Sequence, residues 1–358
     1  MNTELIEVRK DEKLNEESLK LFFSDWLKSK INNFSLKQFS GGHANLTYLI
    51  TVNDEEYVLR RPPLGPIAPS AHDMKREHNV MQALSKKFSL VPNSILLCED
   101  DSIFGAPFHI MDFKEGITIN GDQLPDNFKS TKNANYLSKM LIEVLVKLHN
   151  INPSDVGLEN FGKPIGFLER QLKGWYKRGE IAHYKNSSKA MEELYKHLCS
   201  SSTPKEEEFV ILHNDFKLDN IILEFSKDRN ILEPVAIIDW DQATRGHPLF
   251  DLATLLSYWT LAEDTFNMQL IKQMPSASSG FMSRIEALNL YQKLSGRDIK
   301  DFKWIYALSL LKLGVVFQQL YAQFLRGTIK EDKYKTFNII AEAAYERGIN
   351  ALNKNIYI

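Results

Sequence analysis

Residues 209–223 read FVILHNDFKLDNIIL, and residues 235–251 read VAIIDWDQATRGHPLFD. In the first stretch an apolar run leads into Asp215, and Asn220 follows five residues later. In the second stretch another apolar run ends at Asp239. Short apolar runs bounded by polar residues are typical of strands. The pattern therefore predicts a β-hairpin that brings Asn220 and Asp239 together.

These three side chains have the chemistry that phosphoryl transfer requires. A carboxylate at position 215 can orient a hydroxyl and accept its proton, so Asp215 is the candidate catalytic base. Mg²⁺ takes oxygen ligands and keeps waters and phosphates in its shell, so Asn220 and Asp239 suffice as its protein ligands. The spacing H-x-D-x-x-x-x-N, followed by an apolar strand and Asp, is also that of phosphoryl-transfer kinases. Each residue alone is compatible with an ordinary turn at a strand end.

Other polar residues of this region have less specific interpretations. Lys217 is a candidate for contacting the transferred phosphate, and a surface lysine is the alternative. Asp241 is expected to touch a second metal ion or hold the loop, with a solvated turn as the alternative. His213 ends a buried run and is expected to brace the loop. Asp251 is expected early in a helix, where it favours the helix dipole or braces the catalytic loop.

Composition limits the classes of protein that the chain can belong to. Of its 358 residues, 43% are apolar and 25% are charged, as in ordinary globular proteins. This length favours two lobes. The net charge of −2 gives no reason to expect nucleic acid as a partner. Cys98 and Cys199 indicate neither a disulfide framework nor a metal site. We find no signal peptide and no apolar run of about 18 residues, so we expect a cytoplasmic protein without a membrane partner. The oligomeric state is not indicated.

The hydrophobic pattern changes from strand-like to helical near residues 112–116. Residues 1–112 are expected to form a nucleotide-binding lobe with an N-terminal helix and a five-stranded antiparallel sheet. Residues 113–358 are expected to form a larger helical lobe with the catalytic loop and the acceptor site. Residues 166–200 are expected to be helical, with a break near Gly179. The predicted fold class is α+β, with a small sheet lobe carrying one main helix and a mostly helical second lobe.

A glycine turn between the first two expected strands is a candidate phosphate-binding loop. Glycines let a turn pass close to phosphates and offer backbone N–H groups, although most Gly-Gly pairs are ordinary hairpin turns. The candidate nucleotide contacts in this turn are Gly41, Gly42, His43 and Asn45.

Further candidate nucleotide contacts follow along the first lobe. Arg60 ends the third expected strand and is the candidate cation for the phosphates of a nucleotide. Glu77 lies in the next expected helix and is predicted to pair with Arg60, with solvated charge as the alternative for both. Met111 and Phe113 are expected to offer backbone hydrogen bonds to adenine after the last strand.

With these motifs assembled, the chain resembles the aminoglycoside phosphotransferase and choline kinase-like superfamily, which has a protein-kinase-like two-lobe fold. It resembles in particular the kinase-like module fused to some long acyl-CoA dehydrogenases. The matching stretches include GGHANLTYLI, GAPFHIMDFKEG, LHNDFKLDN and IIDWDQATRGHPLFDLA. The resemblance implies ATP and Mg²⁺ as cofactors and a small-molecule hydroxyl as acceptor. It also implies Asp215 as base, Asn220 and Asp239 as magnesium ligands, and a nucleotide clamp of Arg60 with Glu77.

The sequence departs from the family pattern at three positions. Asn214 stands where many relatives have Gly. Arg60 stands where antibiotic kinases usually have Lys, although the dehydrogenase-fused branch also has Arg. His247 replaces the Asp of a common Gly-Asp-Pro. Because Arg forks to two oxygens and stays protonated, phosphate contact is preserved at position 60 with a different geometry.

The acceptor is the least determined part of the prediction. A basic run with aromatic residues between Arg170 and Lys189 fits an anionic acceptor, and a solvated helix face is the alternative. The dehydrogenase-fused relatives imply a hydroxyacyl-CoA. Aminoglycosides and choline-like or sugar alcohols are the alternatives. A nucleotide-binding regulator without catalysis is an alternative of another class, which Arg60 alone supports. A protein kinase is disfavoured because no Ala-Pro-Glu motif follows Asp239.

Overall fold

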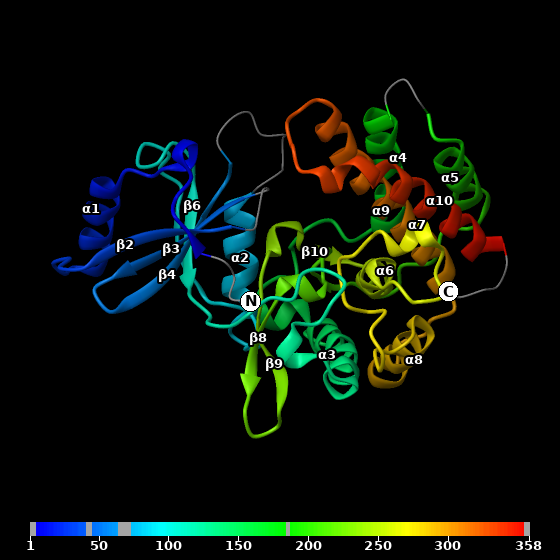
Figure 1. Ribbon diagram of the computed structural model, residues 1–358, viewed down its shortest axis with the longest axis horizontal. Helices are drawn as coiled ribbons and strands as arrows, with labels where there is room; N and C mark the ends of the chain where they lie inside the picture. Colours follow the sequence, from blue (N-terminus) through cyan, green and yellow to red (C-terminus); the bar gives the residue numbers. More distant parts are fainter. Residues whose placement is uncertain (1–4, 41–44, 64–72, 184–186, 354–358) are drawn as a thin grey trace. The chain divides into compact units, whose positions relative to one another are not determined.

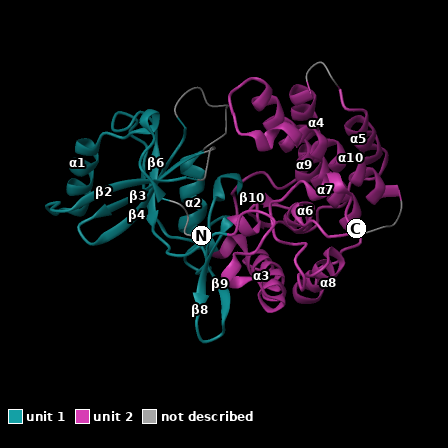
Figure 2. Cartoon of the chain, in the orientation of Figure 1, with its two compact units in different colours: residues 1–118, 156–158, 220–243 teal, residues 119–155, 159–219, 244–358 magenta. Residues whose placement is uncertain are grey.

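The computed structural model describes residues 5–40, 45–63, 73–183 and 187–353 (Figure 1). The chain forms two compact units, and neither is one continuous segment (Figure 2). Unit 1 consists of residues 1–118, 156–158 and 220–243, and unit 2 consists of residues 119–155, 159–219 and 244–358. The expected lobes met at one boundary after residue 112, whereas unit 1 also contains a later hairpin.

Unit 1 contains most of the strands of the protein. Its main sheet is antiparallel and has six strands in the order β1-β2-β3-β4-β6-β5. We expected five strands, and the sixth is β1, whose two residues pair with the end of β2 and are too few to show a period. The elements of unit 1 are β1 (Leu5–Ile6), α1 (Glu16–Leu27), β2 (Phe34–Phe39), β3 (Leu46–Val52), β4 (Glu55–Arg61), α2 (Met74–Leu84), β5 (Ser94–Cys98), β6 (Phe108–Asp112), β8 (Ile221–Ser226) and β9 (Ile231–Ile237).

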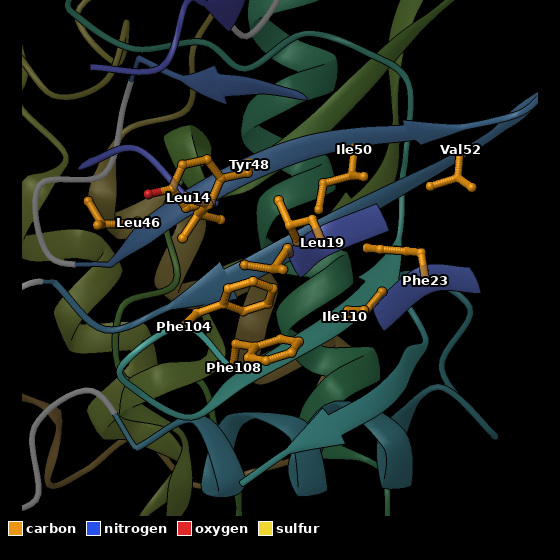
Figure 3. Packing of buried hydrophobic residues seen from close by; sticks show 11 residues of the cluster. Leu14, Leu19, Phe23, Leu46, Tyr48, Ile50, Val52, Phe104, Phe108 and Ile110 are labelled. Atoms are coloured by element: carbon orange, nitrogen blue, oxygen red, sulfur yellow. The ribbon is translucent and has the colours of Figure 1, made fainter. Parts of the chain in front are cut away.

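The alternation of side chains along β3, β4 and β6 divides the residues between the two faces of the sheet. Leu19 and Phe23 of α1 pack into one apolar cluster with Tyr48 and Ile50 of β3 (Figure 3). Leu59 of β4 belongs to the same cluster. Because successive strand residues point to opposite faces, the residue after Leu59 faces away from α1. This position is occupied by Arg60, and the helix α2 packs against β5 and β6.

The hairpin of β8 and β9 forms as expected, and its register decides which loop residues meet. Ile221 pairs with Ile237, so Asn220 and Ile238 face each other just beyond the strands. Pro234 lies inside β9 near a register shift, which is tolerated because each strand of a two-stranded sheet is an edge. The hairpin therefore places position 239 one residue beyond the partner of Asn220.

Unit 2 is mostly helical, as expected, and is built around its longest helix, α9. The helices α4, α5, α6 and α10 all pack against α9. The contact with α10 is close because Gly314 has no Cβ: one added there would lie 2.2 Å from Cε1 of Tyr345. The elements of unit 2 are α3 (Thr131–His149), α4 (Phe167–His183), α5 (Lys189–Ser200), β7 (Val210–Leu212), β10 (Thr244–Gly246), α6 (Pro248–Tyr258), α7 (Phe266–Gln269), α8 (Arg284–Ser295), α9 (Phe302–Leu325) and α10 (Phe337–Asn353).

The predicted helix break near Gly179 is wrong. Gly179 lies inside α4, which continues to His183, and α5 begins at Lys189. A Cβ at position 179 would lie 2.4 Å from Sδ of Met191 and 3.0 Å from a methyl group of Val315. The glycine therefore permits close packing of α4 within unit 2 and does not end the helix.

The helix α9 is more apolar than the sequence analysis suggested. Within the described part of the chain, it alone is long and apolar enough to cross a membrane by length and composition. However, 72% of its apolar window is buried inside the structure, which is the behaviour of a core helix. Its hydrophobicity is explained by packing against four other helices.

Candidate active site

Arg60 lies at the centre of a buried ionic cluster in unit 1. Its Nε lies 3.1 Å from Oε2 of Glu77, and its Nη2 pairs with Oδ1 of Asp239. Nε2 of His109 lies 3.5 Å from the same Oε2 of Glu77. Glu77 is fully buried and Arg60 is 9% exposed. The expected pairing of Arg60 with Glu77 is therefore present, and the carboxylate of Asp239 completes the cluster.

The two central charges of this cluster stabilise each other. Burial opposes the charged form of Arg60, but the negative charges of Asp239 and Glu77 outweigh it and raise the Arg60 pKa. Burial also acts to raise the pKa of Glu77, but Arg60 and the nearby imidazole of His109 lower it below its ordinary value. Both groups are thus ionised at neutral pH. The cluster fixes a guanidinium that can bind phosphate oxygens in a forked geometry.

Asn220 and Asp239 lie at the same end of the β8–β9 hairpin. The backbone N–H of Ile238 donates to the carbonyl oxygen of Asn220 at 2.9 Å. Asp239 has a positive φ of 70°, a conformation that costs free energy for a residue with a side chain. Such local strain is common at ligand-binding positions. The hairpin thus brings together the two residues predicted to bind Mg²⁺.

The donor types at this hairpin end fit magnesium. Asn220 and Asp239 offer one amide oxygen and one carboxylate, and Mg²⁺ completes its octahedral shell with phosphates and water. In the described ranges no three His, Cys, Asp or Glu side chains gather as a metal site. The predicted magnesium ligands, one Asn and one Asp, are not a group of three such side chains, so this finding does not test them.

Part of the predicted glycine turn can be followed in the structure. Gly41, Gly42 and His43 lie outside the described residues. Asn45 is buried directly before β3, and its side-chain amide donates to Oδ2 of Asp241 at 3.2 Å. The carbonyl oxygen of Asp241 accepts a hydrogen bond from Arg76 at 2.6 Å. Asp241 therefore ties the loop after Asp239 to the base of β3 and to α2, which is the loop-holding role considered above.

The two residues predicted to contact adenine differ in their surroundings. Met111 is buried within β6, where it is paired with Val58 of β4 and Ser94 of β5. Phe113 follows the end of β6 and is partly exposed. Met111 lies inside the sheet, between two neighbouring strands, whereas Phe113 lies beyond the end of β6. Phe113 is therefore better placed to offer its backbone to adenine, and the contact itself stays a prediction.

In unit 2 the loop that carries Asp215 is held through its backbone. Asp251 of α6 accepts the N–H of His213 and the N–H of Asn214, each at 2.7 Å. Asn214 has a φ of 65°, the left-handed region that Gly and Asn tolerate best, which accounts for Asn where many relatives have Gly. Burial acts to raise the Asp251 pKa, but hydrogen bonding to His149 and His213 lowers it. Asp251 therefore braces the loop that carries Asp215, the sharper of its two expected roles.

The candidate base, Asp215, forms an ion pair with Lys217, which also lies near a second carboxylate. Nζ of Lys217 lies 2.8 Å from Oδ2 of Asp215 and 3.4 Å from Oδ1 of Asp219. Burial opposes the charge of Lys217, but Asp215 and Asp219 raise its pKa well above its ordinary value. Burial raises the pKa of Asp219 to about 6, although Lys217 opposes this shift. Lys217 thus lies beside Asp215 and is not a surface lysine, whereas its contact with the transferred phosphate stays a prediction.

Two polar residues of this site were missed by sequence reasoning. Asp219 directly precedes Asn220 and resembles a surface carboxylate in the sequence. Lys312 interrupts the apolar pattern of α9, yet it is only 5% exposed, and its Nζ donates to the carbonyl oxygen of Asn214 at 2.5 Å. The available signal for Lys312 was its position in a run of apolar residues on both sides.

The third departure from the family pattern, His247, has a structural role. It is the N-cap of α6, and its Nδ1 accepts the N–H of Leu249 at 3.2 Å. Burial lowers the pKa of His247 to about 4, so the ring is neutral and able to accept. A neutral imidazole thus does what a capping carboxylate does at the start of a helix.

Comparison with known proteins agrees with this architecture. A model of the phosphotransferase enzyme family matches residues 35–273. The chain is 29% identical to acyl-CoA dehydrogenase family member 11 of Gallus gallus, over 96% of this chain and 44% of the relative. The chain therefore spans less than half the length of this curated relative.

Solved structures show the same fold. A candidate aminoglycoside phosphotransferase from Ralstonia eutropha superposes with a TM-score of 0.75 at 24% identity, covering 94% of this chain and 99% of that one. A thermostable mutant of an aminoglycoside phosphotransferase, in a ternary complex with ADP and hygromycin B, gives 0.59 at 14% identity, covering 93% and 98%. The predicted kinase-like fold and the family resemblance are confirmed. By the family match and the fold, this chain belongs to the phosphotransferase enzyme family.

Proposed function

We propose that this chain transfers the γ-phosphoryl group of ATP to a hydroxyl group of a small molecule, with Mg²⁺ as the metal ion. The observation that carries the proposal is the contact between Arg60 and Asp239 at the hairpin end that also bears Asn220. A cation suited to phosphate and two oxygen ligands suited to magnesium are thereby placed together in unit 1. The relative with bound ADP supports a nucleotide as the phosphoryl donor.

The residues of the chain divide the chemistry among them. Asp215 accepts the proton of the acceptor hydroxyl while the oxygen–phosphorus bond forms and the bond between the β- and γ-phosphates breaks, releasing ADP. Lys217, 2.8 Å from Asp215, supplies positive charge beside the base. Arg60 binds phosphate oxygens, held by Glu77. Magnesium, when bound by Asn220 and Asp239, supplies neutralisation of phosphate charge.

The acceptor is proposed to be a small hydroxylated molecule, with a hydroxyacyl-CoA first among the classes to test. The basic run on α4 gives this choice only limited support. Arg170 donates to the carbonyl oxygens of Lys163 and Ile165, so its guanidinium is engaged by the segment that precedes α4. Arg178 lies 4.5 Å over the ring of Trp175 and is exposed. Arg178 is therefore the better candidate for an anionic acceptor.

An acceptor screen tests the proposal. Purified protein with ATP and Mg²⁺ is assayed for ADP release against hydroxyacyl-CoAs, amino alcohols, sugars and aminoglycosides. Asp215→Asn is expected to lower kcat by about 10²- to 10⁴-fold, the usual contribution of a general base, with ATP affinity nearly unchanged. An Asp215→Asn variant with full turnover would refute the assignment of the base. ATP binding without turnover on any acceptor would favour a nucleotide-binding regulator.

A further inference from the structure

Lys312 is a buried cation in the middle of the core helix α9. It is 5% exposed, and its ammonium group lies 5.4 Å from the ring centre of Phe250 and 5.8 Å from that of Trp175. No carboxylate within the described residues forms an ion pair with Lys312. Burying a charged lysine among aromatic rings costs free energy unless a specific interaction compensates for its lost hydration.

That interaction is the hydrogen bond from Nζ of Lys312 to the carbonyl oxygen of Asn214 at 2.5 Å. The N–H of the same residue donates to Oδ1 of Asp251 at 2.7 Å. Both backbone groups of Asn214 are thus bound by charged side chains, one from α9 and one from α6. Asn214 has the positive φ of 65°, a conformation that Asn tolerates better than most residues but that still costs free energy. The next residue along the chain is the candidate base, Asp215.

We propose that Lys312 is a positioning residue for Asp215: its ammonium group binds the carbonyl of Asn214 and fixes the strained turn from which the catalytic carboxylate projects. Among the described residues Lys312 makes no hydrogen bond or ion pair with the candidate base or a candidate metal ligand, so its direct contact with the loop is the carbonyl of Asn214. The part of the inference that concerns turnover rests on the proposed phosphotransferase function. The part that concerns loop order does not.

The charged groups around Lys312 make its effect dependent on pH. Asp215 and Lys217 face it from the loop, Asp251 from α6, and Arg178 from α4. Burial lowers the pKa of Lys312 to about 8, although Asp215 and Asp251 oppose the shift. Above that pH the ammonium becomes a neutral amine and its bond to the carbonyl weakens. The loop is therefore held firmly below about pH 8 and less firmly above it.

The test compares wild type with Lys312→Met, which keeps a similar length among apolar neighbours and removes the charge. A hydrogen bond to a charged group is worth enough to make opening of the loop about 10- to 100-fold more frequent when it is lost. Amide hydrogen exchange at His213 and Asn214 is expected to accelerate by that factor. With an acceptor from the screen, kcat is expected to fall about 10- to 100-fold while the KM for ATP is nearly unchanged.

The pH profile separates positioning from a general loss of structure. For wild type, kcat is expected to fall above about pH 8. The variant Lys312→Arg keeps a charge that is not lost in this range, so its alkaline limb is expected to shift upward or disappear. Lys303→Met, on the same helix, is the matched control and is expected to behave as wild type. Thermal melting confirms that each variant is folded.

The outcomes distinguish this inference from the proposed function. If wild type turns over and Lys312→Met keeps its kcat and its slow amide exchange, the positioning role is refuted while the phosphotransferase function stands. If wild type releases no ADP with any acceptor, the proposed function fails, and amide exchange alone then decides whether Lys312 holds the loop. Unchanged exchange in that case refutes the inference as well.

Discussion

Replacing Asp251 by Asn tests how the catalytic loop is held. The two oxygens of Asp251 accept the N–H groups of Asn214 and His213 at 2.7 Å, and Oδ2 also lies 3.4 Å from Nε2 of His149. An amide has only one acceptor oxygen, so its NH₂ group must face at least one of the donors. A fully buried backbone N–H then loses its acceptor, and the remaining bond loses its charge assistance.

The expected cost follows from these two losses. A buried donor left without an acceptor costs about 1–3 kcal/mol, and a hydrogen bond that changes from charged to neutral loses about 1 kcal/mol more. Removing the charge of Asp251 also leaves buried positive charge nearby less well compensated, which adds to this cost. Asp251→Asn is therefore expected to lower the free energy of unfolding by about 2–5 kcal/mol. Urea unfolding at pH 7 measures this change, with Asp25→Asn on an exposed turn of α1 as the control that leaves stability unchanged.

The pH dependence gives the direction of the effect. The pKa of Asp251 is lowered below the ordinary value of 3.8, by hydrogen bonds that outweigh burial. A carboxyl group with a lowered pKa stabilises the fold above the unfolded-state pKa and loses that contribution as pH falls through the folded-state pKa. The stability gap between wild type and Asp251→Asn is thus expected to be constant above about pH 5 and to narrow in acid. A gap of less than about 0.5 kcal/mol at pH 7 would refute the reasoning.

Three further substitutions test the packing and the ionic cluster. Gly314→Ala is expected to destabilise the protein by about 1–3 kcal/mol because the new methyl group would overlap Tyr345. Gly174→Ala, whose new methyl group would have its nearest neighbouring atom at 3.7 Å, is expected to stabilise α4 by up to about 1 kcal/mol. Thermal unfolding of both variants measures the contrast, and equal effects would count against the tight contact of Gly314 with Tyr345. Glu77→Gln removes the buried carboxylate partner of Arg60 and is expected to lower the free energy of unfolding by about 3–5 kcal/mol, which denaturation measures. It is also expected to weaken ATP binding, which calorimetry measures. An unchanged affinity for ATP would show that the pair does not serve nucleotide binding.

The parts of the fold that a local pattern encodes could be predicted from the sequence. The strands of the first hundred residues show alternation or β-branched runs, and the hairpin end with Asn220 and Asp239 follows from the spacing of two apolar runs. Gly179 was taken for a helix break because glycine disfavours helices, but close packing against Met191 overrides that preference. β9 begins at Ile231, earlier than expected, because Pro234 concealed the strand.

The parts of the site that depend on contacts distant in sequence could not be predicted. Lys312 lies 98 residues from Asn214, and no local pattern relates them. The raised pKa of Asp219 likewise results from burial and from the negative charge of Asp215, against the opposing charge of Lys217, and the sequence displays none of these contacts. In contrast, the pairing of Arg60 with Glu77 could be predicted from a cation at a strand end and an acid in the next expected helix, and the family resemblance implies the same pair.

A crystal structure of the protein with Mg²⁺ and a non-hydrolysable ATP analogue would test the central claim most directly. The account predicts metal–oxygen distances of about 2.1 Å from Mg²⁺ to the side chains of Asn220 and Asp239, with Arg60 on the phosphates and Asp215 facing the γ-phosphate. A nucleotide bound elsewhere, or a metal ion held without Asn220 and Asp239, would contradict it.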